Sequence, residues 1–105
     1  MTYRGQPSDA RVRLAFFDIG GVQLELVEPV GDESAWKEGL DMHGEAVHHL
    51  AFRTENMVKV AAELDEHGAE LVQRGDMGEG QYAYFDAEPL GCVLELLESK
   101  RSEDV

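Results

Sequence analysis

The sequence has a single cysteine, Cys92, only nine basic residues, and no long apolar run. One cysteine cannot form an internal disulfide, which favours a reducing compartment, so we expect a cytoplasmic protein. No stretch is apolar enough to span a membrane or to act as a signal peptide. The basic residues are outnumbered by 22 acidic ones, and the formal net charge is −13. Such a chain repels nucleic acid and anionic membranes, so we expect neither as a partner.

Two stretches of the chain, seventy residues apart, have nearly the same sequence. Residues 20–28 read Gly-Gly-Val-Gln-Leu-Glu-Leu-Val-Glu, and residues 90–98 read Leu-Gly-Cys-Val-Leu-Glu-Leu-Leu-Glu. Each stretch places one carboxylate, Glu25 or Glu95, between two leucines. The likeness extends upstream to two further pairs of segments: 13–18 with 81–86, and 4–5 with 74–75. An internal repeat of this kind predicts two copies of one small module.

We predict an α+β fold of paired βαβββ modules, the first of them incomplete. Residues 45–72, with an expected strand and helix, have no upstream counterpart, so the first module lacks its opening strand and helix. The expected order within one domain is a partial first module (1–29), a connector (30–45), a complete module (46–98) and an acidic tail (99–105). The expected strands are 11–18, 22–28, 46–53, a short one near Leu71, 81–86 and 92–97, and Pro29 is expected to end the second of them. One helix is expected to start after Ser34, and another to span about 56–67. Turns are expected at 5–10 and a mobile glycine-rich loop at 75–80.

Alternation along the strands selects candidate site residues. Leu94 and Leu96 share an apolar face that we expect to pack on a helix, which leaves Glu95 on the second face. A half-buried carboxylate needs a cation, hydrogen bonds or a metal. His48 and His49 are expected to point to opposite faces of their strand, with His49 toward the two glutamates.

One imidazole and two carboxylates suit a divalent ion such as zinc, cobalt, nickel, manganese or iron. Each residue also has an ordinary explanation, because a strand glutamate usually lies at a rim and a histidine pair is more often structural. Two equivalent glutamates in equivalent strands favour the metal site formed by Glu25, His49 and Glu95.

Three segments are typical of a known family: Gly44-Glu-Ala-Val-His-His-Leu-Ala-Phe52, Glu70-Leu-Val-Gln, and Cys92-Val-Leu-Glu-Leu-Leu-Glu98. Through them, and over residues 11–98, the chain resembles the vicinal oxygen chelate superfamily, which includes glyoxalase I, bleomycin resistance proteins and dioxygenases, and within it methylmalonyl-CoA epimerase. It implies two modules around a divalent metal, with Glu25, His49 and Glu95 as ligands. The family's fourth ligand, a histidine on the first strand of the first module, has no counterpart here.

The resemblance implies a metal-dependent isomerase or lyase that acts on a small acyl thioester or 2-oxo substrate through an enolate, with Glu95 as ligand or base. The epimerases carry a glutamate base where this chain has Arg13, and a guanidinium cannot take a proton from carbon. Arg13 could instead pair with a substrate carboxylate or phosphate. The alternative is a non-catalytic small-molecule-binding relative or an inactive remnant of the fold.

We expect a homodimer, which could arise in two ways. Second modules from two chains could pair and share a site of two His49 and two Glu95 residues, without Glu25. Alternatively, each chain keeps its own pairing and exposes a sheet edge, which is prone to association.

Overall fold

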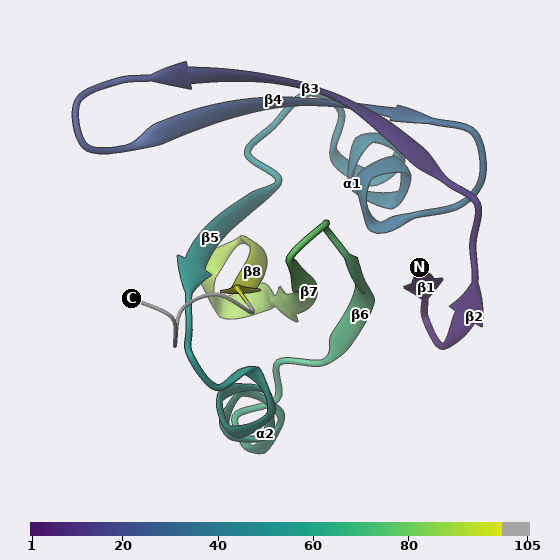
Figure 1. The fold of residues 1–105 in the computed structure, drawn as a ribbon. Helices are drawn as coiled ribbons and strands as arrows, with labels where there is room; N and C mark the ends of the chain where they lie inside the picture. The colour runs from purple at the N-terminus through teal and green to yellow at the C-terminus, as the bar shows by residue number, and fades with distance from the viewer. Residues whose placement is uncertain (100–105) are drawn as a thin grey trace.

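The computed structural model describes residues 1–99 and has an α+β architecture (Figure 1). The elements are β1 (Thr2–Tyr3), β2 (Gln6–Pro7), β3 (Arg11–Asp18), β4 (Gln23–Val30), α1 (Ala35–His43), β5 (His49–Arg53), α2 (Met57–Glu66), β6 (Leu71–Asp76), β7 (Gly80–Ala87), the short 3-10 helix η1 (Glu88–Leu90) and β8 (Cys92–Ser99). They form a six-stranded sheet in the order β2-β1-β6-β7-β8-β5 and a separate β3-β4 hairpin. No helix in the described residues is long and apolar enough to cross a membrane. Most of the expected acidic tail, residues 100–105, lies outside the described part.

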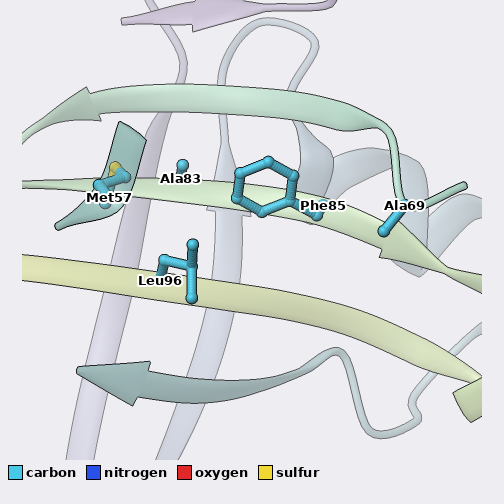
Figure 2. Close-up of a cluster of buried hydrophobic side chains, with 5 residues drawn as sticks. All are labelled: Met57, Ala69, Ala83, Phe85 and Leu96. Carbon is cyan, nitrogen blue, oxygen red and sulfur yellow. The ribbon is translucent and has the colours of Figure 1, made fainter. Parts of the chain in front are cut away.

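The segment from β5 to β8 has the predicted βαβββ order, with β5 parallel to β8 and β8 antiparallel to β7. The amide oxygen of Asn56 accepts a hydrogen bond from Lys59 N, which caps the start of α2. Met57 in the first turn of α2 packs with Ala83, Phe85 and Leu96 of the sheet, as Figure 2 shows. This confirms that the all-apolar face of β8 lies against a helix.

The β3–β4 hairpin confirms the predicted strands, with Phe16 opposite Glu25 and Arg13 opposite Glu28. Gly20 adopts a φ of 65° at the turn, a conformation that glycine permits. The prediction that Pro29 ends the strand is wrong, because β4 continues to Val30. β4 pairs only with β3 in the described residues, and a proline is tolerated on such an edge strand.

The outer face of this hairpin matches the helix-covered face of β7–β8 residue for residue. In the repeat, Ala15, Phe17, Leu24 and Leu26 correspond to Ala83, Phe85, Leu94 and Leu96. Phe85 and Leu96 are 3% and 4% exposed under α2, whereas Phe17 and Leu26 are 50% and 54% exposed. The hairpin therefore keeps an apolar face that no element of the described chain covers.

Helix α1 fills the space between the hairpin and the large sheet (Figure 1). It begins after Ser34, whose hydroxyl accepts a hydrogen bond from Lys37 N, and ends at Gly44, as predicted. Trp36 is buried in a cluster with Tyr84 and Val72 of the sheet, and Val12 and Val27 of the hairpin pack against this cluster. The connector thus joins the two sheets through a shared core.

Two local predictions need correction. The expected turn at residues 5–10 includes strand β2, and Thr2 and Tyr3 of β1 also pair with β6. The expected loop at 75–80 is shorter, because β6 extends to Asp76 and β7 begins at Gly80. Gly75 allows close packing there, since a Cβ on it would lie 2.8 Å from Tyr82 Cε1.

Candidate functional site

Three predicted residues meet where the hairpin approaches the six-stranded sheet. Glu25 comes from β4, His49 is the first residue of β5, and Glu95 lies in the middle of β8. His49 Nε2 is 3.3 Å from Glu25 Oε1 and 3.2 Å from Glu95 Oε1. The side chains of His49 and Glu95 are 9% and 10% exposed, and that of Glu25 is 23% exposed. The two glutamates of the repeat therefore converge on one imidazole nitrogen within a single chain.

The two carboxylates favour a cation at this point. Burial raises the pKa of Glu25 and the charge of Glu95 raises it further, while His49 acts in the opposite direction. Glu95 is itself buried, and a buried carboxylate is costly unless it is paired. A proton or a metal ion bound at His49 Nε2 therefore stabilises both carboxylates.

The expectation that His48 and His49 point to opposite faces is wrong. Strand β5 begins at His49, so the alternation of a strand does not extend to His48. His48 Nδ1 is 2.9 Å from His49 Nδ1, and His48 Nε2 is 3.0 Å from the backbone oxygen of Ala35. Burial, the largest effect, lowers the pKa of His48; the hydrogen bond with the Ala35 carbonyl raises it, the charge of His49 lowers it, and nearby glutamates raise it slightly. A neutral His48 ring is therefore favoured.

Tyr84 forms an aromatic wall of the site that the sequence did not reveal. It lies directly opposite Glu95 in the β7–β8 ladder, and its ring is 5.1 Å from that of His49. Its hydroxyl oxygen accepts a 2.9 Å hydrogen bond from Trp36 Nε1. Burial and then the charge of Glu95 raise the pKa of Tyr84, so its hydroxyl stays protonated. The register of the β7–β8 pairing, which places Tyr84 opposite Glu95, is the feature that could have identified Tyr84 as a site residue.

Arg13 does not lie in the cluster of Glu25, His49 and Glu95. It faces Glu28 across the hairpin, and alternation places this pair on the face opposite to Phe16 and Glu25. Arg13 Nε is 3.6 Å from Glu28 Oε1, and the Arg13 side chain is 80% exposed. It lies on the outer face of the hairpin.

The hairpin residues beside the site are about half exposed. Phe16, directly opposite Glu25, is 52% exposed, and Leu14 on the same face is 44% exposed. Two surface depressions of about 430 and 240 Å³ lie elsewhere, and neither is lined by Glu25, His49 or Glu95. A ligand would therefore reach the cluster along the apolar side chains of Leu14 and Phe16.

The donor set fits a divalent metal in its chemistry. Within residues 1–99, no group of three or more His, Cys, Asp or Glu side chains is spaced as a ready-made metal cage. Glu25, His49 and Glu95 nonetheless combine a borderline nitrogen donor with hard oxygen donors, the mixture found in catalytic sites of zinc and related metals. Three protein donors leave coordination positions for a substrate.

Comparison with known proteins identifies the family. A sequence profile described as the glyoxalase/bleomycin resistance protein/dioxygenase superfamily matches residues 1–85. The chain belongs to this superfamily. It is 30% identical over 96 residues to the uncharacterized protein YqjC of Bacillus subtilis strain 168, a match that covers 88% of this chain and 69% of that protein. Members of the superfamily commonly use divalent metals.

Solved structures agree with this assignment. A hypothetical protein from Bacillus halodurans C-125 is 27% identical, with a TM-score of 0.66 over 85% of this chain and 67% of its own. A methylmalonyl-CoA epimerase in complex with methylmalonyl-CoA and ammonium, and a variant of the Streptomyces coelicolor methylmalonyl-CoA epimerase in complex with 2-nitronate-propionyl-CoA, are each 30% identical. Each has a TM-score of 0.63 over 84% of this chain and 68% of its own. These likenesses confirm the predicted glyoxalase-like fold.

Proposed function

We propose that this protein is a metal-dependent isomerase or lyase that moves a proton next to the carbonyl group of a small acyl thioester or 2-oxo compound. The convergence of Glu25 and Glu95 on His49 Nε2 carries the proposal. It is supported by the likeness to two methylmalonyl-CoA epimerases, one of them bound to methylmalonyl-CoA. The proposed metal is zinc, cobalt, nickel, manganese or iron.

Each residue in and around the cluster has a proposed role. A divalent ion held by Glu25, His49 and Glu95 supplies Lewis acidity, which makes a proton beside a carbonyl group more acidic. Glu95, buried beside His49, is the carboxylate placed to hold the proton after its removal. Leu14 and Phe16 give the hairpin side an apolar lining, while the hydroxyl of Tyr84 stays protonated beside the cluster.

A single carboxylate base would exchange a proton with solvent on one face of the substrate. Arg13 does not provide a second base, because it is a guanidinium on the outer face of the hairpin. Exchange or isomerisation through one base is therefore favoured over a two-base epimerisation.

The test combines metal binding with proton exchange. Cobalt is titrated by calorimetry into the wild-type protein and into Glu25→Gln, Glu95→Gln and Glu28→Gln, the last being a control on the same strand but the other face. We expect one ion per chain, with binding weakened about 10-fold or more in the first two variants only. Loss of the α-proton signal of methylmalonyl-CoA in D₂O then reports catalysis. Absence of stoichiometric metal binding overturns the enzyme proposal.

A second candidate function is binding without catalysis. It is favoured by Arg13, which stands where the epimerases carry a glutamate base and lies on the outer face of the hairpin. Binding of methylmalonyl-CoA without proton exchange in the cobalt-loaded protein would support this reading.

We also propose that the chain forms a homodimer in a reducing, cytoplasmic setting, where its free Cys92 is stable. The second copy would cover the apolar outer face of the hairpin, whose repeat counterpart is buried under α2. Glu25 already contacts His49 within one chain, so the shared two-chain site is not needed. Sedimentation should show a dimer that Leu26→Asp dissociates and that Val58→Asp, on the exposed surface of α2, leaves intact.

A further inference from the structure

We infer that two copies of this chain pack through the outer faces of their β3–β4 hairpins, with a twofold axis along the strands and Arg13 of each copy facing the partner's Glu28. The inference rests on the homodimer proposed above and adds its arrangement and its two polar contacts. No element of residues 1–99 lies on the side of the hairpin away from α1 (Figure 1). By alternation, that side presents Arg13, Ala15 and Phe17 of β3 beside Glu28, Leu26 and Leu24 of β4.

Arg13 and Glu28 form the polar end of this face and are held loosely within one chain. Arg13 Nε is 3.6 Å from Glu28 Oε1, which is longer than a hydrogen bond, and the two side chains are 80% and 65% exposed. The guanidinium donors and the carboxylate oxygens are therefore accessible to a partner. Toward the hairpin turn the face is apolar, with Phe17, Leu24 and Leu26 about half exposed. A fitting partner offers an apolar patch with charges of both signs at one end.

A second copy offers this pattern in one orientation. When the twofold axis runs along the strands, each β3 residue lies over the partner's copy of the residue with which it pairs in its own hairpin. Arg13 then faces the partner's Glu28, the reverse contact forms as well, and Phe17 faces the partner's Leu24. Aligned sheets pack at about 30° to each other, so this correspondence holds over a face as short as a hairpin.

A twofold axis across the strands does not give this match. It places β3 over the partner's β3, so that Arg13 lies over either the partner's Arg13 or apolar side chains. Like charges repel, and a charge against an apolar surface loses its hydration, so both contacts are unfavourable. The charge pattern therefore favours the axis along the strands.

The same charges favour a second copy over a helix as the occupant of this face. In the second module, Gln81 stands in the place of Arg13 and donates a 2.6 Å hydrogen bond to Glu98 Oε1. Glu98 Oε2 in turn accepts a hydrogen bond from Met57 N, where α2 begins. In the hairpin, Arg13 puts a positive charge at that place, and it would repel the positive end of a helix dipole.

This contact leaves the candidate site accessible in both copies. Glu25 and Phe16 lie on the opposite face of the hairpin, toward the large sheet. The outer face is small beside the roughly 20–30 residues that a stable interface contributes per partner. We therefore expect a dimer that dissociates on dilution.

The test mixes two charge variants of the full chain. Glu28→Arg carries two cations at the polar end, and Arg13→Glu carries two anions. Sedimentation measures each variant alone at several concentrations, and native mass spectrometry measures heterodimers in an equal mixture. Lys59→Glu and Glu63→Arg, on the exposed surface of α2, form a control pair with the same changes in net charge. Circular dichroism verifies that each variant is folded.

We expect each charge variant alone to dimerise about 10-fold or more weakly than the wild type, and the mixture to form heterodimers above the random proportion. Added salt should reduce this preference, and the control pair should show none. A mixture that forms no more heterodimer than the control pair overturns the arrangement, even if the wild type is a dimer. A wild-type dimer that Leu26→Asp leaves intact overturns it too, while the homodimer itself stands. A monomeric wild type overturns both, and cobalt binding to Arg13→Glu reports the proposed metal site independently.

Discussion

Replacing Phe85 by alanine should cost far more stability than replacing Phe17, although the two residues are equivalent in the repeat. Phe85 is 3% exposed and packs in the cluster under α2, whereas Phe17 is 50% exposed. A buried Phe→Ala change costs about 3–5 kcal/mol, because the cavity adds to the lost transfer free energy. Full burial of a Phe side chain contributes up to about 3 kcal/mol of transfer free energy, and at Phe17 only about half of the side chain is buried. Because no cavity forms there, we expect Phe17→Ala to lower the free energy of unfolding by about 1 kcal/mol.

The assay is urea unfolding followed by Trp36 fluorescence at several protein concentrations. If Phe85→Ala does not fold, the equivalent pair Leu96→Ala and Leu26→Ala provides the same comparison, since Leu96 is 4% and Leu26 54% exposed. If the two variants of a pair lose equal free energy of unfolding at concentrations where the chain is monomeric, the outer face of the β3–β4 hairpin cannot be uncovered. A loss at Phe17 that grows with protein concentration would instead indicate that a second copy covers it.

Three further predictions follow from single contacts. Tyr84→Phe removes the acceptor of the Trp36 indole and should lower the free energy of unfolding by about 1–2 kcal/mol in urea titrations. The pKa of Glu25 is raised in the folded state, so its ionisation opposes folding. Glu25→Gln should therefore raise the melting temperature at pH 7, and the gain should vanish as the pH falls below the ordinary glutamate pKa of 4.5. The pKa of Glu98 is lowered, chiefly by the backbone N–H of Met57; Glu98→Gln should lower the melting temperature above that value of 4.5, and the loss should fade on acidification.

Strand periodicity, the repeat and the family resemblance were sufficient to predict the second module and to select Glu25, His49 and Glu95, whose side chains meet in the structure. Alternation along β8 separates Glu95 from Leu96, and the repeat transfers the same parity to Glu25. This parity depends only on local geometry, which the sequence encodes directly.

The features that the sequence did not reveal concern positions where long-range packing overrides local pattern. His48 lies one residue before β5, and its ring is placed by α1 rather than by the strand. The contact of Tyr84 with His49 depends on the register between strands, which alternation alone does not fix. Arg13 was assigned from the resemblance, while the pairing with Glu28 puts it on the outer face.

The position of β8 in the chain has a consequence for biosynthesis. β8 pairs with β7 on one side and with β5 on the other, and it contributes Leu96 to the core under α2. The ribosome makes it after every other strand of the described chain, so β5 must wait for a partner about forty residues downstream. Glu95 arrives with that last strand. Any ligand that requires Glu95 together with His49 can therefore bind only chains in which β8 has been made and has paired with β5.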